Sequence, residues 1–332
     1  MTNSINIDDL KNDKKKKIYK HLWENQEFGF NIVKTGKTDP SYEFELIDYI
    51  GTGLAKIFDI KSQKNLFLSK FRMSCSGNGD ELQKITTLHS SSLCALLFFF
   101  NVDNHPLEIK GLNGYEFSKS FFEFKNKVIG YPSNIDIVLL GINKKTKKRV
   151  ILFLESKFSE YITGVTKVGK SFEIGKSYFS NKIDCFSKPI YEELKNQKIL
   201  NYRKKGEKFY LESSEDNYIE GLKQLISHYY GIRNFIRNKF YEKDNNSLKD
   251  IKNYNAEEVI LGEILFDNFG KDLEFYYTTY EEKYQKLADI IDEQCKKEKI
   301  TNFRVHNKIF KYSDLKNSLI DFPRIKSFYF GK

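Results

Sequence analysis

Cysteine is scarce in this chain, and its placement excludes a fold built on disulfides or structural zinc. Only four cysteines occur among 332 residues, and no two of them have the Cys-x-x-Cys spacing of common zinc sites. They are Cys75, Cys94, Cys185 and Cys295. We therefore expect free thiols in a reducing compartment, which predicts a cytoplasmic protein.

Long apolar runs and ligand-binding glycine loops are also missing. The longest apolar run, Leu93–Phe100, is too short to span a bilayer, and the polar N-terminus with Lys14–Lys17 lacks the apolar core of a signal peptide. Gly77-x-Gly79 is too short for a phosphate-binding loop, and the histidines have neither HNH nor metal-ligand spacing. The sequence thus predicts no membrane segment, no nucleotide-binding loop and no histidine metal centre.

Positive charge is present in excess. The chain has 55 Lys and Arg residues against 45 Asp and Glu residues, a formal net charge of +10. A basic chain suits a polyanionic partner such as nucleic acid, although a lysine excess also fits solubility alone. The length allows one large domain or two small ones, and no repeat or proline-rich linker divides the chain.

The most informative feature is a pair of apolar segments, the second of which ends in Glu155-Ser156-Lys157. Asn134–Gly141 and Arg149–Lys157 flank the polar turn Asn143–Lys148, a pattern that predicts a β-hairpin. Five consecutive apolar residues precede Glu155, which indicates a strand covered on both faces. A carboxylate and an ammonium are costly there unless they are paired or bind a ligand.

Strand geometry predicts which of these charges meet. Side chains alternate with a period of two, so Glu155 and Lys157 point the same way, and antiparallel pairing can bring Asp136 beside them. Two carboxylates and a lysine at the end of a buried sheet suit a Mg²⁺ site with an adjacent cation. The alternative is a salt bridge at a strand end. Among the other acid-x-lysine matches, Glu123-x-Lys125 is the main rival, because Phe121-Phe122 precede it.

At this point the residues resemble a known family. Asp136, Glu155 and Lys157 resemble the motif of the PD-(D/E)XK nuclease superfamily, which includes type II restriction enzymes and RecB-like nucleases. Cys75–Leu82 is similar to the opening of some bacterial restriction endonucleases, and Gly221–Tyr230 to the Gln-containing helix of RecB-like members. One departure is that Ile135 stands where the family has proline before the aspartate.

The resemblance implies a fold and an activity. The fold class is α/β, a restriction-endonuclease-like α/β/α sandwich around a mixed central sheet. The core would span 76–240, between a basic helix and β-rich extension at 1–75 and an α/β extension at 241–332. The implied activity is that of a Mg²⁺-dependent nuclease, with Mn²⁺ as a substitute, acting on double-stranded DNA as a restriction or defence endonuclease. One site per chain favours a two-fold homodimer for cutting both strands.

The same resemblance assigns roles to residues. Asp136 and Glu155 would bind the metal, with the Ser156 carbonyl as a third ligand, and Lys157 would orient water or stabilise the transition state. Glu81, with Asp80 as the fallback, would supply a further acid and a second metal site, unless it is an ordinary first-turn helix acid.

Gln224 would position water or phosphate, unless it is a helix-surface glutamine. His228 could share the Gln224 face and approach the site, although a buried structural histidine is the simpler interpretation. Two other functions stay open: a non-catalytic nucleic-acid-binding module, and a nuclease acting on RNA or recombination intermediates.

The remaining patterns predict secondary structure. Predicted strands are Phe28–Val33, Tyr42–Ile50 before a turn at Gly51–Gly53, Val259–Phe266 and Phe303–Lys311. The Phe-rich segment Tyr115–Val128 fits either a strand or a hairpin. Predicted helices are an N-terminal basic helix or arm within residues 1–25, Leu82–Leu88, Leu93–Phe100 with a cap at Ser90–Ser92, Tyr218–Phe240 and Tyr280–Lys297. Gly164–Lys182 fits either a surface loop or a basic segment facing the substrate.

Overall fold

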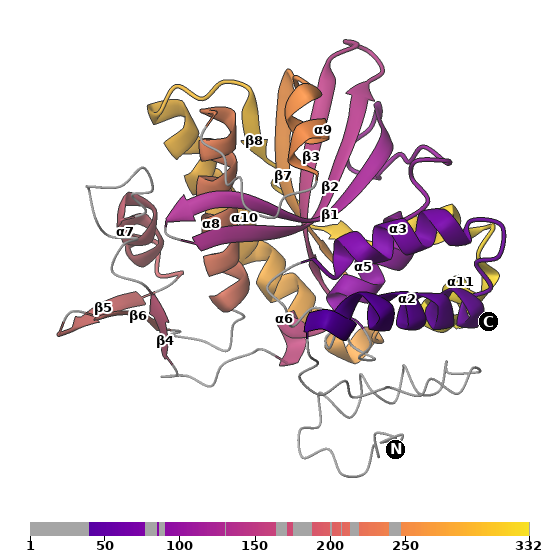
Figure 1. Ribbon diagram of the computed structural model, residues 1–332. Helices are drawn as coiled ribbons and strands as arrows, with labels where there is room; N and C mark the ends of the chain where they lie inside the picture. Colours follow the sequence, from indigo (N-terminus) through magenta and orange to yellow (C-terminus); the bar gives the residue numbers. More distant parts are fainter. Residues whose placement is uncertain are drawn as a thin grey trace.

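Six strands form a mixed central sheet in this protein, seen in the computed structural model of Figure 1. The structure describes residues 40–76, 85, 90–129, 131–163, 171–174, 188–199, 201–206, 208–212, 219–238 and 247–331. The strand order is β1-β2-β3-β7-β8, and β9 also pairs with β7. The strands are β1 (Tyr115–Ile129), β2 (Tyr131–Asn143), β3 (Arg149–Lys157), β7 (Glu258–Leu265), β8 (Phe303–Val305) and β9 (Phe310–Lys311).

The first three strands form an antiparallel meander, and the remaining strands of the sheet are parallel to β3. The pairs β1–β2 and β2–β3 are antiparallel, whereas β7 is parallel to β3, and β8 and β9 are parallel to β7. Val150–Leu154 of β3 is at most 1% exposed, and Ile260 and Leu261 of β7 are fully buried. Continuous apolar runs suit parallel strands covered on both faces, as the sequence predicted for β3.

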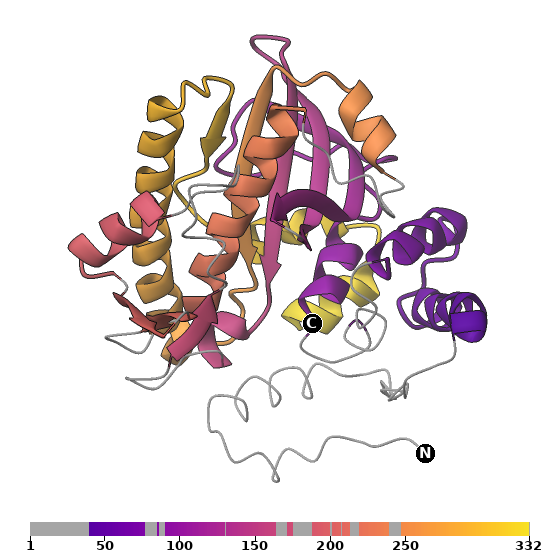
Figure 2. The same ribbon diagram turned by 60° about the vertical axis from the view of Figure 1, so that its left-hand side comes forward.

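Helices cover both faces of the sheet (Figures 1 and 2). On one face, Phe235 of α8 packs edge-on against Phe153 of β3, and Tyr280 of α10 donates a hydrogen bond to Glu263 of β7. On the other face, the Ser156 hydroxyl donates to the Ser91 carbonyl of α5. The helices of these layers are α2 (Pro40–Ile57), α3 (Lys64–Ser74), α5 (Ser91–Phe99), α8 (Ile219–Ile236), α10 (Glu274–Lys297), the 3-10 helix η4 (Tyr312–Leu319) and α11 (Pro323–Phe330).

Several local predictions are confirmed. Helix α5 begins after Ser90, whose side-chain oxygen accepts a hydrogen bond from the Leu93 N–H at 3.0 Å. This contact satisfies one of the unpaired N–H groups at the helix start. The hairpin of β2 and β3 and the helices α8 and α10 also form where the sequence places them.

Smaller elements lie outside the central sheet. Strands β4, β6 and β5 form a second sheet of three strands in that order. These elements are α6 (Glu160–Thr163), β4 (Ser171–Ile174), α7 (Lys188–Asn196), β5 (Asn201–Lys205), β6 (Lys208–Glu212), α9 (Leu248–Asn253) and the 3-10 helix η3 (Lys271–Leu273).

One strand prediction is wrong. The segment Tyr42–Ile50 lies inside helix α2, which also runs through the predicted turn at Gly51–Gly53. Its buried residues Ile47, Ile50 and Leu54 recur at helical spacing, which a short window mistakes for alternation. Gly51 serves close packing, since a Cβ there would lie 2.8 Å from the Phe71 ring. The part of the N-terminal extension that the structure describes is therefore helical.

The C-terminal segment contributes to the sheet itself. The expected boundary at residue 240 falls between α8 and β7, yet β7 pairs with β3 over its whole length. The predicted strand Phe303–Lys311 forms two short strands, β8 and β9, both paired with β7. Residues 247–331, the described part of the expected extension, thus complete the central sheet.

Several predicted elements lie outside the described residues: the basic arm in 1–25, the strand at Phe28–Val33, most of the helix at Leu82–Leu88, and most of Gly164–Lys182. Among the helices that the structure describes, none combines the length and apolar character needed to cross a bilayer.

At Asp136 the β1–β2 hairpin rotates about its long axis, so the regular alternation of side chains between the two faces is interrupted. Val138 faces α8, because it pairs with Phe153, whose ring contacts Phe235. Ile135 also faces α8, because its partner Phe124 contacts the same two rings. Residues three apart face opposite sides of a regular strand, so β2 must turn over between Ile135 and Val138.

Strand β1 has an irregular backbone at the position that faces this rotation in β2. Flanking pairs place Glu123 opposite Asp136, and Glu123 has a φ of +52°, which side chains other than glycine rarely adopt. Beyond this point the hairpin crosses toward α8 (Figure 1).

Gly231 of α8 permits the close approach of that helix to the hairpin. A Cβ at Gly231 would lie 2.7 Å from the Asn126 Cβ and 3.5 Å from a Val128 methyl. We predict that Gly231→Ala lowers the free energy of unfolding by about 1–3 kcal/mol, the usual cost of overpacking.

Gly53 of α2 is the matched control for that substitution. A Cβ at Gly53 would meet no atom within 4 Å among the described residues. Gly53→Ala should therefore stabilise by up to about 1 kcal/mol through helix propensity. Urea unfolding of both variants checks the pair, and a stable Gly231→Ala would mean that α8 and the hairpin are not in close contact.

Candidate active site

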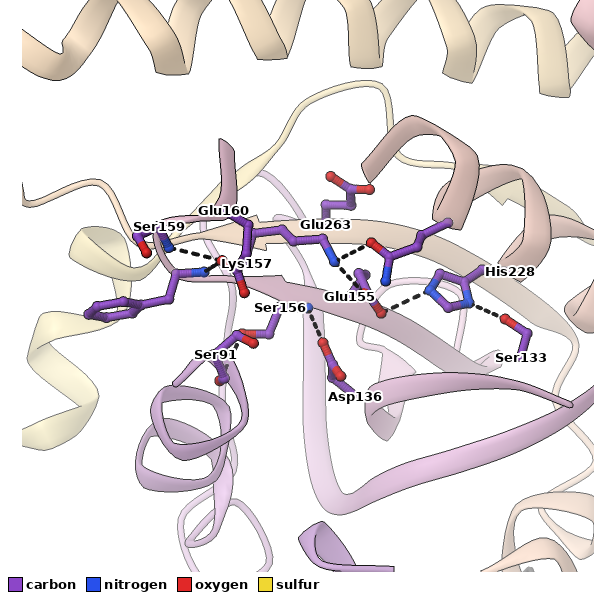
Figure 3. Close-up of polar contacts among 12 residues, drawn as sticks. Ser91, Ser133, Asp136, Glu155, Ser156, Lys157, Ser159, Glu160, His228 and Glu263 are labelled. Atoms are coloured by element: carbon purple, nitrogen blue, oxygen red, sulfur yellow. Dashed lines mark hydrogen bonds and ion pairs between the residues drawn. The ribbon is translucent and has the colours of Figure 1, made fainter. Parts of the chain in front are cut away.

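Three predicted site residues meet where β2 leaves β3. The described pairing of these strands ends at Ile137 and Leu154. One residue further, the Asp136 carboxylate accepts a hydrogen bond from the Ser156 N–H at 2.7 Å, in place of a strand partner (Figure 3). The Asp136 carboxylate therefore lies at the end of β3, where the charges of Glu155 and Lys157 act on it.

Glu155 and Lys157 form a buried ion pair on the α8 face. The Lys157 ammonium bonds one Glu155 oxygen, and it donates to the Gln224 side-chain oxygen of α8 at 2.8 Å. Both charged residues are 3% exposed. The predicted Gln224 therefore reaches the site, where it holds the lysine.

His228 fixes the other oxygen of Glu155. Its Nε2 lies 2.8 Å from that oxygen, and its Nδ1 lies 2.5 Å from the Ser133 hydroxyl. An ionised carboxylate can only accept, so Nε2 carries a proton and donates to Glu155. His228 follows Gln224 by four residues, one helical turn. Both interpretations of His228 thus hold: it is buried and hydrogen-bonded, and it lies in the site.

The two carboxylates have opposite electrostatic environments. Burial alone would raise the pKa of Glu155, but the charges and hydrogen bonds of Lys157 and His228 hold it at about 2. For Asp136, removal from water and the negative charge of Glu155 raise the pKa well above its usual range. The positive charge of Lys157 also lowers the pKa of Asp136, but it does not outweigh these two effects.

Glu263 is a further acid at this site that the sequence analysis did not select. It lies on β7 in register with Glu155 and is fully buried. The Tyr280 hydroxyl donates to one carboxyl oxygen at 2.7 Å, while the other is buried without a hydrogen-bond partner in the described part of the chain. Burial raises the pKa of Glu263 to about 8. A lone acid inside the apolar run Val259–Phe266 was the signal available in the sequence.

The raised pKa of Glu263 predicts a pH-dependent stability. In the unfolded chain this carboxyl ionises near its ordinary pKa of 4.5, whereas the folded protein keeps its proton up to about pH 8. The contribution of Glu263 to the free energy of unfolding is therefore complete at low pH and is lost as the pH rises. Between the unfolded and folded pKa values the loss is about 1.4 kcal/mol per pH unit. Relative to the wild type, Glu263→Gln should therefore gain stability as the pH rises through this window. Urea unfolding at several pH values measures the difference, and a constant difference would contradict the assignment.

The donor set fits a divalent cation held by two carboxylates. No group of three His, Cys, Asp or Glu side chains is close enough to bind a metal among the residues described. However, Mg²⁺ often takes only one or two carboxylates and keeps several waters. The second Asp136 oxygen has no hydrogen-bond partner within the described ranges, and a cation there would compensate the charge of both acids. The Ser156 carbonyl points to the same strand edge as its N–H.

The other predicted residues have different outcomes. Glu81 and Asp80 lie outside the described residues. Glu123 and Lys125 of the rival motif are both buried on β1. The Ser156 hydroxyl lies 2.8 Å from the Tyr312 hydroxyl on the opposite face from Glu155.

Comparisons with known proteins identify no relative of this chain. No family model matches the chain, and no curated protein or solved structure is detectably similar to it.

Proposed function

We propose that the protein is a Mg²⁺-dependent nuclease that hydrolyses phosphodiester bonds in DNA. The observation that carries the proposal is the convergence of Asp136, Glu155 and Lys157 at the end of β3. Helix α5 followed by the β1–β3 meander and then by α8 and the parallel strand β7 supports the finer assignment to a restriction-endonuclease-like sandwich.

The metal would be held by Asp136 and Glu155, with the Ser156 carbonyl. When bound, it supplies a more acidic water and neutralises charge on the phosphate. Mn²⁺ would substitute for it.

The chain's own residues supply a buried positive charge. Lys157 is buried, and a charge in a site of low dielectric acts more strongly on developing negative charge than one in water. Gln224 and His228 are positioning residues, since they hold Lys157 and Glu155 respectively. Asp136 and Gln224 are the partly exposed members and mark the open side of the site.

A cleavage assay tests this function. The full chain is incubated with supercoiled plasmid and linear duplex DNA in Mg²⁺ or Mn²⁺, with and without EDTA. Asp136→Asn, purified in parallel, controls for contaminating nucleases. Metal-dependent cleavage by the wild type alone is expected; equal cleavage by both proteins would reject the site.

The choice of nucleic acid is tested with the same two proteins. Phosphate contacts release counterions, so binding should weaken steeply with salt. Single-stranded DNA and RNA are compared with duplex DNA. Cleavage of RNA alone would make the protein an RNA nuclease, and salt-dependent binding without any cleavage would make it a binding module. The proposal extends to a homodimer that cuts both strands, which sedimentation of the DNA-bound Asp136→Asn variant would detect.

A further inference from the structure

The free oxygen of Glu263 needs a physical explanation. Glu263 and Glu155 pair in register on adjacent parallel strands, so their side chains share the face covered by α8 and α10 (Figure 3). One Glu263 oxygen accepts from Tyr280, and the other is fully enclosed without a hydrogen bond among the described residues. Burying a polar atom without a partner costs free energy, so such an atom commonly has a role in another state of the molecule.

Lys157 is the nearby group able to use that oxygen. Its ammonium now bonds Glu155 and Gln224. Lys157 lies on the same face of the adjacent strand, and its positive charge opposes the rise that burial causes in the pKa of Glu263. A lysine side chain has a flexible four-carbon stem and three donors, so its ammonium can exchange acceptors without backbone movement.

Both oxygens of Glu155 already accept a hydrogen bond. Lys157 occupies one carboxylate oxygen and His228 the other. A divalent cation bound by Glu155 would place a second positive charge beside the Lys157 ammonium, and the repulsion between them would weaken the bond between Lys157 and Glu155. A buried ammonium that loses this acceptor must find another, or pay a large desolvation penalty.

We propose that Glu263 is a second acceptor site for Lys157, a positioning residue that receives the ammonium when Glu155 takes a cation. The inference rests on the metal site of the proposed function. Gln224 can remain bonded to the ammonium in both positions. The Glu263 carboxyl need not be ionised beforehand, since a neutral carboxylic acid also has an oxygen that accepts a hydrogen bond.

A double-mutant cycle on metal affinity tests the inference, because Glu263 should act only through Lys157. Calorimetric titration with Mn²⁺ should show about tenfold weaker binding by Glu263→Met than by the wild type, the effect expected of one lost coupling between close groups. In a Lys157→Met background, Glu263→Met should change the affinity by less than about twofold. Glu263→Gln keeps an acceptor oxygen and should recover most of the wild-type affinity.

Two further variants keep the test interpretable. Asp267→Asn removes a carboxylate beyond the end of the same strand, where it accepts from Ser313, and should leave Mn²⁺ affinity unchanged. If Glu263→Met does not fold, Glu263→Leu in a Tyr280→Phe background replaces it, since no tyrosine hydroxyl is then left unpaired. Circular dichroism confirms each fold.

The outcomes separate this inference from the proposed function. An equal loss of affinity with and without Lys157 would mean that Glu263 acts on the metal directly, and would overturn the inference. Wild-type binding that needs Asp136 but not Glu263 would overturn the inference alone. A wild type that binds no Mn²⁺ would overturn the metal site and the inference together.

Discussion

Lys157→Met should slow phosphodiester cleavage at least about a hundredfold, the scale of losing one preorganised charge-stabilising group. It should leave most of the divalent metal binding intact, because the expected ligands Asp136, Glu155 and the Ser156 carbonyl are unchanged. Lys157 bonds both Glu155 and Gln224, and Gln224 can hold the ammonium whichever carboxylate it contacts. Single-turnover cleavage measured beside calorimetric metal titration separates the loss of rate from the loss of metal.

The same substitution also removes half of a buried ion pair. Breaking such a pair typically costs about 3–5 kcal/mol, so the fold of Lys157→Met must be confirmed under the assay conditions. Lys125→Met is the matched control, since Lys125 is also a buried strand lysine in an acid-x-lysine pattern. Cleavage that survives in Lys157→Met but not in Lys125→Met would move the active site to Glu123 and Lys125.

Elements with strong local patterns could be predicted from sequence. Strand β3 follows from its unbroken apolar run, and α5 follows from its serine cap and continuous hydrophobicity. Helix α2 could not be predicted in the same way, because the two glycines after Ile50 suggest a turn. Gly51 instead allows α3 to pack closely, a tertiary contact without a local signal.

The site was predictable where it depends on two strands that are adjacent in the sequence. Glu155 and Lys157 share a face of β3, and Asp136 lies on the neighbouring strand, so strand geometry predicts their meeting. The contact between Ser133 and His228 was not predictable, because it requires β2 to turn over at Asp136. Glu263 needed the parallel pairing of β7 with β3, which joins segments more than a hundred residues apart.

Asp136→Asn should abolish cleavage without weakening the metal-free fold. Loss of a metal ligand removes several kcal/mol of transition-state stabilisation, which corresponds to about a thousandfold in rate. The asparagine oxygen can still accept from the Ser156 N–H, as the carboxylate does. The substitution also removes a charge beside Glu155.

The sign of the stability effect follows from the pKa of Asp136. Removal from water and the charge of Glu155 raise this pKa, so the stability that Asp136 contributes is present at low pH and lost as the pH rises. At neutral pH the melting temperature of metal-free Asp136→Asn should therefore equal or exceed that of the wild type. Added Mn²⁺ should raise only the wild-type value, because a ligand stabilises the state that binds it.

Asp103→Asn is the contrasting variant, because Asp103 is an acid with a structural partner. Its carboxylate accepts from the buried Lys70 at 2.8 Å and 2.9 Å and from the Ser120 N–H. Asp103→Asn should lower stability by about 1–3 kcal/mol, the usual cost of weakening a hydrogen-bonded buried charge, and leave the cleavage rate unchanged. Asp136→Asn should therefore lose cleavage rate but keep its melting temperature. Asp103→Asn should lose melting temperature but keep its cleavage rate. If Asp136→Asn instead lost stability while keeping its rate, Asp136 would be a structural acid like Asp103, and the metal site would have to be rejected.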